Sequence, residues 1–165
     1  MTKEISLFNR QKKFKIYFRK VRPLVGHLLG DCLKLSEWNL SIVFLGPKSI
    51  TKWNEEHLQH KGPADILTYD YSNNPNDLTP LNSITGELLI CPQVAFEISH
   101  KYGKSWPNEL SRYMVHGILH LLGYDDINPK DRKIMKRAEN KWMKHLETQF
   151  DLDSIGCITN DPDKR

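Results

Sequence analysis

One segment, His116 to Asp126, constrains the fold more than any other part of the chain. It reads HGILHLLGYDD, so two histidines stand four residues apart in an apolar run that glycine closes. Four residues make about 1.1 turns of an α-helix, and the two imidazoles therefore leave the same helix face. Gly123 is a suitable helix stop, after which the chain can fold back toward that face. The segment predicts a helix and turn that bring two imidazoles and a carboxylate together.

The helix that carries this segment has recognisable ends. Ser105 is a suitable N-cap, and Pro107 fits the first turn, where its missing N–H is no loss. Two stripes run along the helix between Ser105 and Gly123. The apolar stripe predicts a core face and consists of Leu110, Tyr113, Met114, Ile118 and Leu121. The polar stripe beside it consists of Glu109, Arg112, His116 and His120.

Apolar periodicity predicts a small sheet and several further helices. Strands are expected over residues 5–8, 40–45, 65–71 and 84–91. Helices are expected over residues 14–33, 48–57 and 92–103, and from Pro129 onward with a buried face of Ile134, Met135, Ala138, Trp142 and Leu146. Pro23 should kink or split the first helix. The stretch 72–82 is rich in Asn, Pro and Asp and predicts a loop.

The chain has 165 residues, of which 39% are hydrophobic and 27% charged, as expected for one soluble globular domain. We expect the α+β class, with a small mixed sheet of about four strands packed with helices. The domain should cover residues 1–150, and the polar stretch 151–165 should be a flexible tail. No apolar run approaches the ~20 residues of a membrane span. The sequence begins without a secretory signal, and its scattered cysteines (Cys32, Cys91 and Cys157) suggest reduced, small buried side chains in a cytoplasmic protein.

Charge is distributed unevenly along the chain, whose net charge is +4. Two segments are rich in lysine and arginine, and such clusters suit a polyanion such as RNA. A single basic run is more often a solvated helix face, but here two runs flank the histidine segment. The first comprises Lys3, Arg10, Lys12, Lys13, Lys15, Arg19, Lys20 and Arg22. The second comprises Lys130, Arg132, Lys133, Lys136, Arg137, Lys141 and Lys144.

The paired histidines are candidate ligands for one divalent metal ion, most simply Zn²⁺. Catalytic zinc takes three protein ligands and keeps a position for water. Asp126 is the expected third ligand beside His116 and His120, and Asp125 is the rival. The carboxylate that does not bind the ion should orient a ligand instead. Two histidines at this spacing can also merely decorate a half-buried helix, but the Gly-Tyr-Asp-Asp continuation favours a metal site.

The segment resembles the signature of the YbeY family of bacterial endoribonucleases and rRNA maturation factors, H-G-x-L-H-L-x-G-Y-D-H. The chain departs from it at the last position, where Asp126 stands for the third histidine. Two upstream stretches are also similar to family blocks: Asn54 with residues 64–69, and residues 86–90. The resemblance covers about residues 40–146. The matching motif positions are His116, Gly117, Leu119, His120, Leu121, Gly123, Tyr124 and Asp125.

This resemblance implies an α+β fold similar to that of zinc peptidases and a zinc ion on the three motif positions. It also implies cleavage of single-stranded RNA during maturation of small-subunit ribosomal RNA. A carboxylate oxygen binds zinc at a distance similar to imidazole nitrogen, so Asp126 is an acceptable substitute. Its negative charge should make a zinc-bound water less acidic and broaden the metal choice toward manganese or magnesium. Leu58 occupies the place of a family arginine that is thought to contact RNA, so either Lys61 or Arg112 replaces it or the phosphate contact is weaker.

The leading functional hypothesis is metal-assisted hydrolysis of a phosphodiester. Asp125 or the activated water itself would manage the proton, and Arg112 would contact the phosphate unless it pairs with Glu109. A second hypothesis is a non-catalytic, RNA-binding ribosome-biogenesis factor with a structural metal. A metallopeptidase ranks last, because Gly117 stands where the H-E-x-x-H enzymes carry their general-base glutamate.

Overall fold

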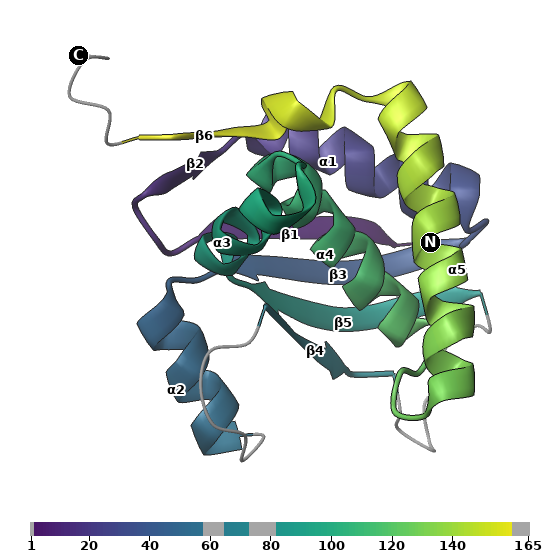
Figure 1. Ribbon diagram of the computed structural model, residues 1–165. Helices are drawn as coiled ribbons and strands as arrows, with labels where there is room; N and C mark the ends of the chain where they lie inside the picture. Colours follow the sequence, from purple (N-terminus) through teal and green to yellow (C-terminus); the bar gives the residue numbers. More distant parts are fainter. Residues whose placement is uncertain (1, 58–64, 73–81, 160–165) are drawn as a thin grey trace.

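The computed structural model describes residues 2–57, 65–72 and 82–159 and confirms the α+β class (Figure 1). Its main sheet has four strands in the order β1-β3-β5-β4. Strands β1 (Lys3–Asn9), β3 (Glu37–Phe44) and β5 (Ser83–Ile90) are parallel, and β4 (Ile66–Asp70) is antiparallel to β5. Every one of these strands overlaps an expected strand. The sheet is therefore mixed, with β1 and β4 at its edges.

Helices cover the sheet and account for most of the other described residues. Helix α1 (Phe18–Gly26) continues into a π-helical segment, η1 (His27–Cys32). Helices α2 (Pro47–His57), α3 (Pro92–Tyr102), α4 (Trp106–Leu121) and α5 (Pro129–Gln149) follow. Figure 1 shows α4 lying across one face of the sheet, with α3 and α5 on either side of it. None of the described helices is long and apolar enough to cross a membrane.

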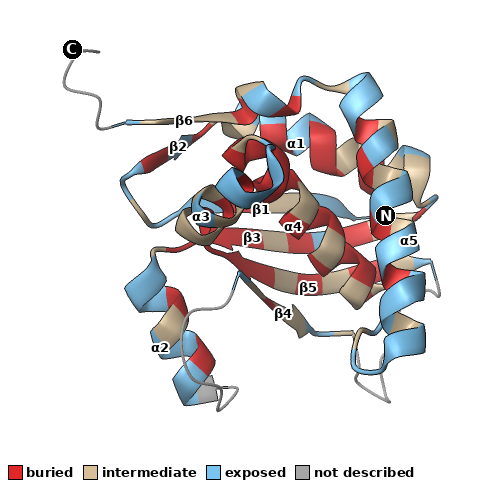
Figure 2. Cartoon of the chain, in the orientation of Figure 1, coloured by how far each residue is buried: buried red, intermediate tan, exposed pale blue. Residues whose placement is uncertain are grey.

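Helix α4 forms the centre of the molecule. Ser105 is its N-cap, as expected, and the Ser105 hydroxyl accepts a hydrogen bond from the backbone N–H of Asn108 at 3.1 Å. Gly123 follows the helix in the left-handed region, with φ +102°, which suits glycine. Every residue of α4 is buried except Arg112, His116 and His120, which stand four residues apart on one stripe (Figure 2).

Gly117 allows α4 to approach the sheet closely. A Cβ atom at this position would lie 2.6 Å from Ile66 Cδ1 and 2.8 Å from Leu88 Cδ2, far inside van der Waals contact. Gly86 on β5 faces the end of the same helix, and its Cβ would lie 2.7 Å from the Tyr69 carbonyl oxygen and 2.8 Å from Leu121 Cδ2. Both glycines therefore fit because they have no side chain at the helix–sheet contact.

The predicted helix over residues 14–33 is wrong at its beginning. Phe14–Ile16 form a short strand, β2, and the helix starts only at Phe18. Buried Phe14 and Ile16 alternate with exposed Lys15, which is the period of a strand. Pro23 lies in the second half of α1 without splitting it, although it removes one backbone hydrogen bond of the helix. The helical geometry changes later, at His27.

The predicted flexible tail is wrong for its first part. Residues Leu152–Ile155 form a short 3₁₀ helix, η2, and Gly156–Ile158 form a strand, β6, that pairs antiparallel with β2. Leu152 and Ile155 are buried in the main core. The composition of the tail is polar, but its few apolar side chains find partners at the other end of the sequence. Residues 160–165 lie outside the described residues.

Two further expectations concern Ile134 on α5 and the loop over residues 72–82. Ile134 was expected on the buried face of α5, but its side chain is 48% exposed, and buried Glu139 shares that face with Met135, Met143 and Leu146 instead. Residues 73–81 of the expected loop lie outside the described residues, as do Leu58 and Lys61.

Burial predicts different losses of stability for two isoleucine-to-alanine changes. Ile155 is 2% exposed, so Ile155→Ala should lower the free energy of unfolding by about 2–5 kcal/mol. Ile134→Ala is the matched control, and it should change that free energy by no more than about 0.5 kcal/mol. Urea unfolding of both variants measures the difference. Equal, small effects would show that residues 151–159 do not pack as described.

Candidate metal centre

Three side chains converge where α4 ends. His116 Nε2 lies 3.1 Å from His120 Nε2, and Asp126 Oδ2 lies 3.5 Å from the first nitrogen and 3.4 Å from the second. The two histidines come from successive turns of α4, and the turn after Gly123 brings Asp126 back over them. The helix spacing and the glycine break thus produce the cluster that the sequence predicts.

Hydrogen bonds hold both imidazoles with the same nitrogen facing inward. His120 Nδ1 lies 3.0 Å from the backbone carbonyl oxygen of Tyr124, which can only accept, so Nδ1 carries the proton. His116 Nδ1 lies 2.9 Å from Glu139 Oε2 and donates to it in the same way. The Nε2 lone pairs of the neutral rings are therefore directed at the point that Asp126 faces. This is the arrangement in which histidine binds metals.

The donor set fits a zinc-like ion. Tetrahedral coordination with ligand distances of about 2.0–2.2 Å places neighbouring ligand atoms roughly 3.3–3.5 Å apart. The three separations between His116, His120 and Asp126 lie at or just below this range. The histidine side chains are 24% exposed and that of Asp126 is 41% exposed, so the cluster is open on its outer side. Water or a substrate oxygen can therefore approach it.

Asp125 lies apart from the inward-facing atoms. Its side chain is exposed, and its Oδ1 accepts a hydrogen bond from the backbone N–H of Asp126 at 2.7 Å. It also lines a shallow hollow with Leu122, Tyr124 and Ile134 beside the turn. Neighbouring carboxylates have diverged, as side chains of adjacent residues tend to do. Asp125 therefore positions the backbone that carries Asp126.

Glu139 is a site residue that sequence reasoning missed. It projects from α5 with only 5% of its side chain exposed. It accepts hydrogen bonds from His116 Nδ1 at 2.9 Å and from Arg112 at 2.6 Å, and Lys136 Nζ lies 3.4 Å away. A signal was present, because Glu139 continues the buried α5 stripe of Met135, Met143 and Leu146. A carboxylate on an apolar stripe requires a buried partner.

The pKa shifts of this pair show a site that favours positive charge. Burial raises the pKa of Glu139, but hydrogen bonds from His116 and Arg112 and the charge of Lys136 lower it to about 2. Burial lowers the pKa of His116, but the hydrogen bond and charge of Glu139, followed by the charges of Asp126 and Asp65, raise it on balance. A proton or a metal ion at His116 is stabilised by the same negative charges.

Arg112 is committed to Glu139. One guanidinium nitrogen contacts both Glu139 Oε1 at 2.6 Å and Asn140 Oδ1 at 2.9 Å. The expected alternative, an ion pair with Glu109, is therefore replaced by one with Glu139. Glu109 is buried, and burial raises the pKa of its carboxyl group despite the nearby Arg112 charge. Arg112 thus helps to hold Glu139, which in turn orients His116.

A cavity adjoins the polar stripe of α4. Its volume is about 580 Å³, and Arg112, Lys136 and Asn140 line it together with Lys104 and Tyr102. Glu109 and Asp65 also reach it. Arg112 lies one turn before His116 on this stripe, but none of the three cluster side chains lines the cavity.

The two basic runs do not form one continuous surface around the cluster. The second run begins α5 next to the turn that carries Asp126. Part of the first run lies on and near β2, which Figure 1 shows at the opposite side of the molecule from the start of α5. Only the second run is therefore close to the cluster.

Comparison with known proteins identifies one family. Residues 6–147 match the family model described as endoribonuclease YbeY. The chain is 34% identical to endoribonuclease YbeY of Protochlamydia amoebophila, with 87% of this chain and 93% of that protein covered. It is 27% identical to the same enzyme of Thermodesulfovibrio yellowstonii, with 87% and 97% covered. The solution structure of TM1509 from Thermotoga maritima matches 98% of this chain with a TM-score of 0.63 at 21% identity, a likeness of fold.

The geometry predicts that Glu139 supports metal affinity without being a ligand. Glu139→Gln keeps the shape of the side chain but removes its charge, and it should weaken zinc binding about 10–100-fold. Competition with a chromogenic chelator measures the affinity, and His116→Ala identifies which binding phase belongs to this cluster. Glu147→Gln is the matched control on the same helix, because Glu147 contacts Asn108 and Lys104 instead. Equal affinities in the two variants would contradict a role for Glu139.

Proposed function

The chain belongs to the endoribonuclease YbeY family, and from this premise we propose that it is a metal-dependent endoribonuclease that cleaves single-stranded RNA by hydrolysis. The observation that carries the proposal is the convergence of His116, His120 and Asp126 within 3.1–3.5 Å of one another. Their open outer side supports an ion that retains room for water and a phosphate oxygen.

In this proposal, the three side chains hold one divalent ion, most simply Zn²⁺. A bound ion of this kind supplies polarisation of a phosphoryl oxygen and a lowered pKa for the attacking water. Tyr124 and Glu139 keep the imidazoles directed inward by accepting their Nδ1 protons. Asp125 is exposed next to Asp126 in the sequence, and its carboxylate is the proposed acceptor of a proton from water.

The cavity beside α4 supports a path for the RNA backbone. Lys104 and Lys136 line it and offer cationic groups to phosphates, and the exposed lysines and arginines that begin α5 extend the positive surface. Arg112 also lines the cavity, and its side chain is 22% exposed although its guanidinium pairs with Glu139. Arg112 is therefore proposed both to position Glu139 and to contact the substrate.

The proposed biological substrate is a single-stranded stretch of precursor ribosomal RNA, at the 3′ end of the small-subunit RNA, in the cytoplasm. The family resemblance supports this substrate, and the positive surface beside the cluster is compatible with it. A non-catalytic factor that binds the same RNA around a structural metal is the second candidate. The pairing of Arg112 with Glu139 favours that candidate, because it removes part of the charge available to a phosphate.

A peptidase of the H-E-x-x-H type fits the fold poorly. A Cβ atom at position 117 would lie 2.6–3.0 Å from the ends of the Ile66 and Leu88 side chains, so a glutamate there would require both side chains to move. A peptidase would need a general base from another element.

Removal of one ligand tests the activity. His116→Ala should reduce cleavage of single-stranded RNA by more than the about 10–100-fold that changes to supporting residues typically cost. A fluorescent RNA oligonucleotide measures the rate, and casein digestion in parallel measures peptidase activity. His100→Ala is the control, since His100 is exposed on α3 away from the cluster, and it should cleave at the wild-type rate. Unchanged cleavage by His116→Ala in chelator-treated buffer would exclude the proposal, and wild-type protein that binds RNA without cutting it would favour the second candidate.

Replacement of the third ligand tests the role of Asp126. Asp126→His supplies imidazole where the family signature has histidine, and it should keep RNA cleavage while narrowing the choice of metal toward zinc. Asp126→Ala leaves two ligands and should lose at least about tenfold in metal affinity. Cleavage rates at matched concentrations of each metal measure the preference. Wild-type affinity in Asp126→Ala would show that Asp126 is not a ligand.

A further inference from the structure

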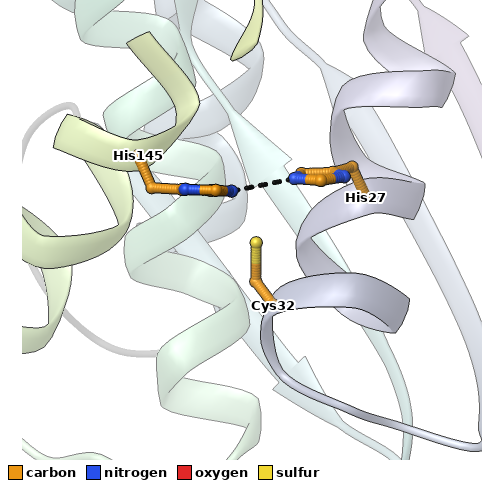
Figure 3. Close-up of side chains that lie close together, drawn as sticks. All are labelled: His27, Cys32 and His145. Carbon is orange, nitrogen blue, oxygen red and sulfur yellow. Dashed lines mark hydrogen bonds between the residues drawn. The ribbon is translucent and has the colours of Figure 1, made fainter. Parts of the chain in front are cut away.

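A second cluster of metal-binding side chains lies away from the first. His27 and Cys32 are the first and last residues of η1, and His145 comes from the second half of α5. Figure 3 shows the three side chains directed toward a common point between the two elements. Their ligand atoms all lie within 4.8 Å of one another. In the residues that the structure describes, this cluster and the one at His116 are the two groups of this kind.

The two imidazoles of the second cluster face each other nitrogen to nitrogen. His27 Nε2 and His145 Nε2 are 2.9 Å apart, and the ring planes differ by only 10°. Cys32 Sγ is directed at the gap between the rings (Figure 3). A tetrahedral zinc ion would require the nitrogens to separate by a few tenths of an ångström, to roughly 3.3 Å. Rotation of one side chain suffices for such a change.

A carboxylate orients His27 as Glu139 orients His116. His27 Nδ1 lies 2.9 Å from Asp31 Oδ2, so the ring donates its Nδ1 proton and keeps the Nε2 lone pair facing inward. The arrangement of carboxylate, imidazole and inward-facing nitrogen is thus present twice in the molecule. Such an outer carboxylate is typical of metal-binding histidines.

The π-helical geometry of η1 is what brings His27 and Cys32 together. In an α-helix, residues five apart are rotated by about 140° from each other and diverge. A π-helix has i→i+5 hydrogen bonds and brings such residues to one side; here the Leu33 N–H donates to the Leu28 carbonyl at 2.9 Å. Runs of π-helix are rare, and they are frequently found at functional sites. The backbone therefore adopts an uncommon form at the segment that presents both ligands.

Aromatic side chains enclose the cluster. Phe150 packs edge-on against His27 at a centroid distance of 5.4 Å, and Trp142 packs against His145 at 6.3 Å. Burial and the charge of Asp31 raise the pKa of the Cys32 thiol, while Lys34 lowers it. A metal ion bound at the cluster would displace the thiol proton of Cys32.

We propose that His27, Cys32 and His145 bind a zinc ion at a second site, which cross-links η1 to α5. Two imidazole nitrogens and one thiolate sulfur are ligands that zinc favours, with water in the fourth position. The ion would join residues that are 118 positions apart in the sequence. The site is independent of RNA cleavage, because none of its side chains belongs to the first cluster.

Cobalt substitution distinguishes the two sites by their donor atoms. Co²⁺ bound by a thiolate gives a sulfur-to-cobalt charge-transfer band in the near ultraviolet, and the cluster at His116 contains no sulfur. Metal-depleted protein titrated with Co²⁺ should show this band in the wild type and in His116→Ala. The band should vanish in Cys32→Ser and in His145→Gln. Cys157→Ser is the matched control, since Cys157 lies on β6 beside Tyr17, and it should retain the band.

Zinc content and stability provide a second measurement. Elemental analysis should find one equivalent of zinc less in Cys32→Ser than in the wild type. Added Zn²⁺ should raise the thermal unfolding midpoint of His116→Ala by several degrees, and it should raise that of His116→Ala/Cys32→Ser by far less. RNA cleavage by Cys32→Ser should remain at the wild-type level.

The outcomes separate this inference from the proposed function. No charge-transfer band in folded wild-type protein, or a band that persists in folded Cys32→Ser, would overturn the second site whatever the RNA assay shows. Conversely, a wild-type protein that does not cleave RNA but shows the band keeps the second site and rejects the nuclease. Circular dichroism of each variant verifies that it is folded.

Discussion

The close contact between α4 and the sheet is the constraint on which the rest of the structure depends. Gly117 brings the helix so near to Ile66 and Leu88 that no Cβ atom fits between them. Gly86 on β5 likewise leaves no space for a Cβ atom where Leu121, at the end of α4, packs against the sheet. With its other sides covered by α3 and α5, α4 leaves one stripe partly exposed, and that stripe carries His116 and His120. A core this densely packed keeps the imidazoles at a fixed separation.

A single buried charge then couples the metal cluster to α5. Glu139 has little access to water, so its carboxylate depends on His116, Arg112 and Lys136 for stabilisation. Loss of one partner would leave a buried charge incompletely compensated, which explains why three cationic or donor groups surround it. The same network explains why Arg112 sits where it does: it neutralises the acid that orients His116. The chemistry of the site therefore extends over two helices, although its ligands come from one helix and the turn after it.

The sequence predicts what local patterns encode and misses what depends on distant partners. The four strands of the main sheet, the Ser105 cap and the convergence of His116, His120 and Asp126 follow from spacing over a few residues. Strand β2 was missed because Phe14 is in helical register with Tyr17 and Phe18, and only the pairing with β6, from the other end of the chain, distinguishes the strand. The polar composition of residues 151–159 predicts a flexible tail. Two of its apolar side chains, Leu152 and Ile155, are nevertheless buried in the main core against elements far away in the sequence.

Glu139 and Cys32 are also residues whose surroundings depend on partners far away in the sequence. The sequence around Glu139 is basic and predicts a solvated side chain, but the fold packs Glu139 against His116. The sequence around Cys32 predicts a small core side chain, but the fold brings Cys32 to the contact between η1 and α5. Glu139 and His145 lie on the same helix, one contacting α4 and the other η1. The orientation of α5 therefore determines both the position of His116 and the approach of His145 to His27. An ion at the second site would tie the second half of α5 to η1, and His116 keeps its own contact with Glu139 whether or not that ion is bound.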